Sequence, residues 1–387
     1  IKKEAGEMKG NSRGIVFCAM AVLLCLWISP TASATETEYE VAVPDEFAGI
    51  LEQLPQELRE SLPDGIFSKD ENDFSAGVGE MSNPAFLLSA VLEMLGVKIR
   101  ESAGALCVCI GLVLLAAVLS QLSHLAGERA ELRFCNRLCI LCAVLSGSFG
   151  VLSGVIDYFS QLTAMITASI PAMGMLYAVG GNVGAAAANS ATLTAALSVC
   201  GAFCGKSVVP VFGTCFALSM MTMIVPGIDL SGFVNLIKKT WMTVFGFLSL
   251  LLTAALSMQT LLAAKSDSLG MKSAKYVAGN LIPVLGGTVA GTLGTLGASV
   301  ELIRSSVGIC GMLLLLLLLL PSLLHILVLR LVYMSAGALA RTLGCGDEAG
   351  LFGELTSLYG YLAGTACVCT VVFFISFALL CGCGTAY

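Results

Sequence analysis

Cysteine, histidine and a lysine within an apolar tract are the side chains of this sequence best suited to chemistry. The 16 cysteines include pairs four residues apart, such as Cys200 and Cys204, which share a helix face. No histidine joins them at the spacing of a zinc site, so we expect them to be small buried hydrophobic side chains. His124 and His325 have no acid–base partner, and no phosphate-binding GxxxxGK(S/T) motif occurs. The sequence therefore predicts no catalytic residue, no metal and no cofactor, and a protein that is not an enzyme.

Lys206 lies between two apolar runs of a long membrane-like tract. A charge inside the hydrocarbon costs at least about 2–3 kcal/mol, so such a residue often marks the path of an ion or a substrate. The alternative is that Lys206 ends a helix or extends its ammonium group to the membrane surface. The other candidate path or packing residues are three prolines, which free backbone groups in membrane helices, and one asparagine. They are Pro210, Pro283, Pro321 and Asn280.

The elements that must position these residues are membrane helices. The 387 residues are 57% hydrophobic and only 12% charged, whereas soluble domains carry about 25% charged residues. From Ser305 to Leu329 the only ionisable side chain is His325, and leucine occupies eight consecutive positions, 313–320. This run is long enough to cross a hydrocarbon core about 30 Å thick. The composition predicts an all-α polytopic membrane protein that binds lipid and not nucleic acid.

Three regions divide the chain. Residues 1–34 have the basic start, the apolar run and the Ala32-Ser33-Ala34 site of a cleaved signal peptide, although an uncleaved anchor is the alternative, and residues 1–7 are expected to precede the true start. Residues 35–103 contain fifteen acidic and four basic side chains and apolar stripes at helical spacing, which predict a small extracytoplasmic helical segment. Residues 104–387 form the polytopic transmembrane domain.

The transmembrane domain is predicted to cross the membrane about eight times, with both mature ends outside. The tract 191–225 could cross once, around Pro210, or twice. A single crossing places eight Lys and Arg residues, among them Arg137, inside against three outside, so the positive-inside rule favours it. This interpretation puts the loop 227–240, with Lys238, in solvent outside the cell. The expected crossings are 104–122, 138–156, 162–180, 191–225, 241–264, two within 275–331 on either side of the charged interval Glu301–Arg304, and 361–381.

Prolines suggest an internal duplication. Ile170-Pro171 and Ile282-Pro283 each lie in a small-residue segment, and a second proline follows each by 39 or 38 residues, at Pro210 and Pro321. Together with the eight crossings, this spacing would give two inverted three-helix repeats whose helices are broken at proline. Inverted repeats place discontinuous helices near the middle of the bilayer, where a path can form.

The segment SAKYVAGNLIPVLGG at 273–287, followed by SSVGICG at 305–311, resembles the stage III sporulation protein AE family of endospore-forming bacteria. The acidic segment after the signal peptide fits the same family. The resemblance implies a permease-like or channel-like subunit of a trans-envelope complex in the mother-cell membrane around the forespore, needed after engulfment. It also implies partners: sibling stage III sporulation membrane proteins, an associated ATPase subunit and a forespore-side partner.

Two other functions remain open from the residues alone. A self-sufficient secondary transporter would suit broken helices and an intramembrane lysine. A membrane scaffold without a conducting path would tolerate neutral substitutions at Lys206 and Asn280. The resemblance supplies no catalytic residues, and no cargo follows from the sequence.

Overall fold

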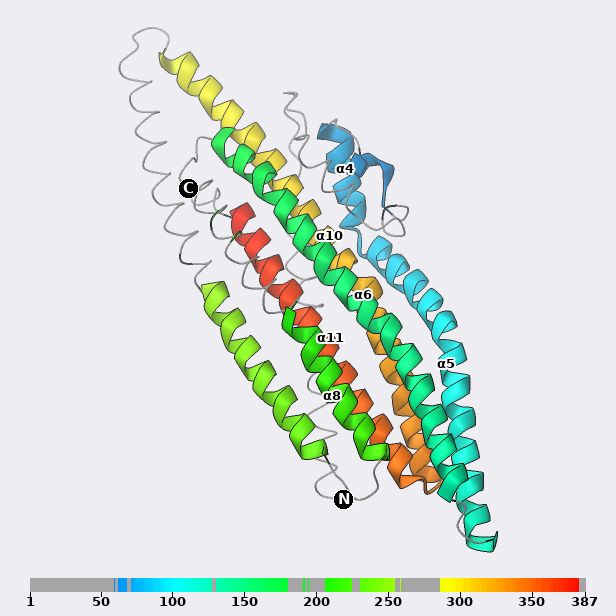
Figure 1. The fold of residues 1–387 in the computed structure, drawn as a ribbon. Coiled ribbons are helices and arrows are strands. Elements are labelled where there is room, and N and C mark those ends of the chain that lie inside the picture. The colour runs from blue at the N-terminus through cyan, green and yellow to red at the C-terminus, as the bar shows by residue number, and fades with distance from the viewer. Residues whose placement is uncertain are drawn as a thin grey trace.

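A computed structural model describes the protein at residues 59, 62–67, 71–126, 130–179, 191, 194, 206–224, 230–254, 258 and 286–382. In these ranges every regular element is a helix, and no strand occurs. Figure 1 shows long helices that lie side by side along one axis. The predicted all-α fold is confirmed.

A small cap precedes the long helices. It consists of the 3₁₀ turn η1 (Asp64–Phe67) and the helix α4 (Glu71–Met81). Ile66 and Phe74 fill the space between the two elements. A Cβ atom on Gly65 would lie 2.6 Å from the Asp73 carbonyl oxygen, and one on Gly77 would lie 2.8 Å from the Ile66 nitrogen. Glycine is therefore required at both positions, because the two backbones are in direct contact.

Six helices in the described part of the chain are long and apolar enough to cross a membrane. Their apolar stretches identify a multi-pass membrane protein, and the predicted count of eight crossings is not confirmed. The helices are α5 (Pro84–Ala126), α6 (Ala130–Val179), α8 (Lys206–Ile224), the helix Ser231–Ala254, α10 (Gly286–Thr342) and α11 (Gly346–Gly382).

Local sequence explains where these helices begin and end. Asn83 caps α5, since its Oδ1 atom accepts a hydrogen bond from the Ala85 nitrogen at 3.0 Å, and Pro84 follows at the first helical position. Gly344 ends α10 with a φ of 77°, and the Cys345 nitrogen donates to the Ala340 oxygen at 2.9 Å. These are the features of a Schellman motif. The motif turns the chain directly into α11, which packs antiparallel to α10.

The paired helices α10 and α11 lie at the centre of the bundle, with α5, α6, α8 and the helix Ser231–Ala254 around them. All eight leucines of the run 313–320 are buried. Tyr333 and Tyr359 stack edge to face between the two helices, with ring centroids 5.3 Å apart. The leucine run that predicts a membrane crossing is thus the core of the bundle.

The prolines do not break the described helices. Pro171 lies inside α6, Pro210 inside α8 and Pro321 inside α10. The prediction of a break at Pro321 is wrong. Proline removes one backbone donor, but a helix enclosed by its neighbours can remain continuous around it. Beside Pro321, the Ser322 hydroxyl donates to the Gly154 oxygen of α6 at 3.1 Å, which holds the two helices together at this level.

Continuous helices also correct the expected boundaries. The ranges 138–156 and 162–180, predicted as separate crossings, lie on α6, which is described to Val179. The charged interval Glu301–Arg304, predicted to separate two crossings, lies inside α10. The domain boundary predicted at 103/104 lies on α5 and stays a prediction. The inverted repeat stays a prediction, and the signal peptide at 1–34 lies outside the described residues.

Candidate functional site

The residues selected from the sequence do not form one site. Lys206 is exposed at the first described residue of α8, and Pro210 follows one turn later. Pro321 is half-buried on α10. Asn280 and Pro283 lie outside the described residues. None of the described three lines the polar cavity at the end of the bundle.

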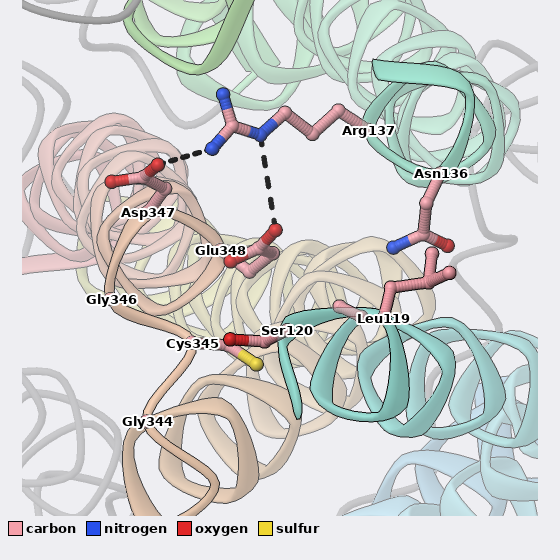
Figure 2. Close-up of a pocket in the computed structure, with 10 residues that line it drawn as sticks. Leu119, Ser120, Asn136, Arg137, Gly344, Cys345, Gly346, Asp347 and Glu348 are labelled. Carbon is pink, nitrogen blue, oxygen red and sulfur yellow. Dashed lines mark hydrogen bonds and ion pairs between the residues drawn. The ribbon is translucent and has the colours of Figure 1, made fainter. Parts of the chain in front are cut away.

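That cavity lies between the ends of α5 and α6 and the turn from α10 to α11, at the lower end of Figure 1. Its volume is about 230 Å³. Figure 2 shows a mixed polar lining with one guanidinium group, two carboxylates, an amide and a thiol. The lining residues are Ala116, Leu119, Ser120, Asn136, Arg137, Gly344, Cys345, Gly346, Asp347 and Glu348.

Arg137 of α6 extends across this cavity (Figure 2). Its Nη2 atom is paired with the Asp347 carboxylate, and its Nε atom lies 3.9 Å from Glu348 Oε1. Its Nη1 atom donates to the Met223 oxygen at 3.4 Å, near the C-terminus of α8. The two carboxylates lie in the first turn of α11. The guanidinium group therefore lies between two negative sources, an acidic first turn and the carbonyl end of a helix.

Asn136, the preceding residue, makes a fourth connection. Its Nδ2 atom donates to the Leu112 oxygen of α5 at 3.4 Å. The side chain is buried, and its Oδ1 atom has no hydrogen-bond partner among the described residues. Two adjacent residues of α6 thus connect that helix to α5, α8 and α11. Arg137 was counted in the sequence only as a cytoplasmic charge, and this structural role was missed.

The Arg137–Met223 contact corrects the predicted topology. The end of α8 and the beginning of α6 lie at the same end of the bundle, since a side chain of one reaches the backbone of the other. The sequence interpretation placed the loop 227–240 on the opposite side of the membrane from Arg137. That prediction is wrong, because its crossing count treated α6 as two crossings.

A second polar group lies deeper in the bundle. Lys238, predicted to lie in a solvated loop, is only 6% exposed on the helix Ser231–Ala254. Its Nζ atom lies 3.2 Å from Glu354 Oε2 and 3.0 Å from Ser357 Oγ, both on α11. The prediction of a solvated lysine is wrong. The neighbouring Lys239 is exposed, so the helical turn separates a buried charge from a solvated one.

Hydroxyl groups form a third polar feature, here called the hydroxyl seam, where α6 packs on α10 and α11. Tyr359 donates to Ser148 Oγ at 2.8 Å, and Ser148 donates to the Val144 oxygen at 2.7 Å. Further along, Tyr158 and Thr370 are hydrogen-bonded at 2.5 Å. These side chains are buried, and paired hydroxyl groups hold neighbouring membrane helices in a fixed register.

Among the described residues, no group of three or more His, Cys, Asp or Glu side chains could hold a metal ion. No disulfide joins the cysteines that the structure describes. Cys345 is buried at the cavity, whereas Cys135, Cys139 and Cys142 are exposed along α6. The arrangement offers ion pairs and hydroxyl groups, and what it can do chemically is hold helices together or release them.

Comparison with known proteins decides the family. A sequence model described as stage III sporulation protein AE matches residues 71–384. The chain belongs to the stage III sporulation protein AE family. It is also 22% identical over 357 residues to stage III sporulation protein AE of Bacillus subtilis (strain 168), which covers 90% of this chain and 86% of that protein. No solved structure matches it.

The resemblance identified from 273–287 and 305–311 is therefore confirmed. The matched region begins at the first residue of α4 and includes the six long helices of the described part of the chain. The cavity, the Lys238–Glu354 pair and the hydroxyl seam all lie within it. The family assignment thus concerns the whole bundle and not one short motif.

Proposed function

We propose that this chain is a permease-like or channel-like membrane subunit of the trans-envelope complex that connects mother cell and forespore after engulfment. The observation that carries the proposal is the family match over 71–384, which covers every described membrane helix. The protein would act in the mother-cell membrane around the forespore. It would work through assembly and not as an enzyme.

The length of the helices supports a role across an envelope. With a rise of 1.5 Å per residue, the 57 residues of α10 extend over about 85 Å, far more than a hydrocarbon core of about 30 Å. Since α10 ends at the cavity, its surplus length lies at the opposite end of the bundle, the end nearer to α4 (Figure 1). Such a projection suits contact with a partner in the space between the two membranes.

Partners are part of the proposal. We expect the chain to assemble with sibling stage III sporulation membrane proteins, an associated ATPase subunit and a forespore-side partner. The apolar faces that α5 and the helix Ser231–Ala254 expose, including Leu92 and Phe247, suit lipid and the helices of neighbouring subunits alike.

Gene deletion and complementation test the role directly. Deletion should leave vegetative growth unchanged and stop sporulation after engulfment, and the full chain should restore spore formation. An affinity-tagged copy, purified in mild detergent from sporulating cells, should bring down the sibling membrane proteins. Normal spore yield after deletion, or purification of the chain alone from sporulating cells, would contradict the proposal.

A secondary transporter is the second candidate, and the buried Lys238–Glu354 pair is the observation that favours it. Ionisable pairs inside membrane bundles often take part in ion coupling. Purified protein in vesicles distinguishes the two functions. A transporter alone should move its solute in response to an ion gradient, whereas a complex subunit should be inactive without its partners.

A further inference from the structure

The side chains of two adjacent residues, Asn136 and Arg137, contact three other helices at one end of the bundle. Asn136 donates to α5 at Leu112, and Arg137 donates to α8 at Met223. Arg137 also pairs with Asp347 on α11. We call this pair of residues, with their contacts, the Arg137 latch. Breaking it would remove contacts from α6 to three helices at once.

The latch spans the cavity. Figure 2 shows Arg137 extending from α6 toward Asp347 and Glu348, with Cys345 on the far wall of the same cavity. Cys345 is 5% exposed. Its thiol lines the cavity that the latch spans, so a release of the latch that widens the cavity should raise the exposure of the thiol. The chain carries a natural reporter for the state of the latch.

Two polar atoms in the latch are incompletely satisfied. Arg137 Nε is buried and has no hydrogen-bond partner among the described residues, since Glu348 Oε1 lies 3.9 Å away. Asn136 Oδ1 is likewise buried without a partner among those residues. Both residues line the 230 Å³ cavity, which is large enough for water to supply hydrogen bonds. Solvent can therefore reach the contacts that hold the latch.

One contact of the latch is accessible to solvent. The Asp347 side chain is 63% exposed, so water and salt can compete for its pairing with Arg137. Glu348, by contrast, is largely buried. The closed state is therefore held partly by a contact that solvent can break, and partly by contacts that re-form when it closes.

We propose that the Arg137 latch is a gate at this end of the bundle, engaged in this structure, whose release widens the cavity and exposes Cys345. The inference rests on the proposed channel role, because a gate would control a path that the complex provides. Thiol labelling measures whether the latch opens, and spore formation measures the role in the complex. Either proposal can therefore fail while the other stands.

The test uses the full chain with Cys345 as its only cysteine, purified in mild detergent, and measures its rate of reaction with a maleimide. The closed latch should make this reaction slow, and high salt should accelerate it. Arg137→Gln should accelerate it by about tenfold or more, since hydrogen bonds to charged groups contribute about 1.5–3 kcal/mol. The reaction rate with Arg137→Lys should lie between those of the original protein and Arg137→Gln, because lysine keeps the positive charge but has no planar set of N–H donors.

Two controls separate gating from unfolding. Lys239→Gln removes an exposed charge outside the latch and should leave the rate unchanged. A second chain with Cys310 as its only cysteine, fully buried in α10, should stay unreactive with Arg137→Gln. If Cys310 also reacts, Arg137→Gln has unfolded the bundle. The salt dependence of the Cys345 reaction in the protein that keeps Arg137 then decides whether the latch is a gate. The proposal would be overturned if Cys345 reacted at the same rate with and without Arg137→Gln. Where the variant exposes Cys310, it would be overturned if salt did not change the rate of Cys345 in the protein that keeps Arg137.

Discussion

The helices α10 and α5 are almost equally apolar and lie in opposite environments. The crossing segment of α10 has a mean hydropathy of 2.8, and that of α5 has 2.6. Inside the bundle, however, 78% of the α10 segment is buried against only 22% of the α5 segment. In a soluble protein such a difference in burial would follow from hydrophobicity. In a membrane it does not.

The difference arises because lipid solvates apolar side chains as well as a protein core does. What keeps α10 inside is its fit to α11 and α6. A Cβ atom on Gly337 of α10 would lie 3.1 Å from the Phe352 Cβ atom of α11, so glycine allows the two helices to approach closely. Tyr333 and Tyr359 then pair with α6 through hydroxyl groups. Small residues and paired polar groups, and not apolarity, determine which helix is central.

The largest expected effect concerns charge at the core. Lys238→Met should lower the free energy of unfolding by about 3 kcal/mol, since it leaves the half-buried Glu354 without its cation. Lys239→Met, at the adjacent exposed position, should change it by less than about 0.5 kcal/mol. Unfolding of the purified protein in mild detergent measures both.

The double variant Lys238→Met, Glu354→Met sharpens this comparison. Replacing both partners by apolar side chains should recover most of the loss. Equal stability of the two single lysine variants would mean that Lys238 is solvated, as the sequence suggested, and would contradict the packing of its helix on α11.

Leucine truncation should have the next largest effect. Leu314→Ala removes a fully buried side chain of α10 and should cost about 2–4 kcal/mol of unfolding free energy. Leu115→Ala removes the same atoms from a position of α5 that is 48% exposed. It should lower the free energy of unfolding by less than about 1 kcal/mol, because lipid fills the space that the side chain leaves. Similar losses at the two positions would remove the distinction between core and lipid face.

Alanine in place of glycine should have the smallest effect. At Gly337 the added Cβ atom meets the Phe352 Cβ atom, and the shift of helices should cost about 1–2 kcal/mol. At Gly111 of α5 nothing lies within 4 Å of it, so alanine should be neutral or stabilise by up to about 1 kcal/mol. Thermal unfolding of the two variants measures the contrast. A loss of stability in Gly111→Ala would mean that another helix packs against α5 at this position.

Helical class, membrane character and family could be predicted from the sequence, since long apolar runs and one distinctive segment carry them. The limits of individual helices could not. Glu301–Arg304 suggested an interruption of a crossing, yet α10 is long enough to carry such charges beyond the hydrocarbon. Pro321 suggested a break for a similar reason, since sequence does not show the neighbours that enclose it.

The polar features were hidden for two physical reasons. Lys238 and Lys239 appear together as a solvated pair, but a helix directs adjacent side chains about 100° apart, so only one faces α11. Arg137 and Asp347 are 210 positions apart in the sequence, and nothing local relates them. Lys206, the charged residue that the sequence suggests for a path, is exposed at the start of α8. Its role in a path stays a prediction.

The gathering of helix ends around Arg137 is the claim on which the topology and the latch both depend. Single cysteines introduced at Gly232, Thr342 and Glu80, in an otherwise cysteine-free chain, test it by labelling with an impermeant maleimide before and after permeabilisation. Positions 232 and 342 should react from one side of the membrane and position 80 from the other. Labelling of position 232 together with position 80, and not with position 342, would contradict the structure.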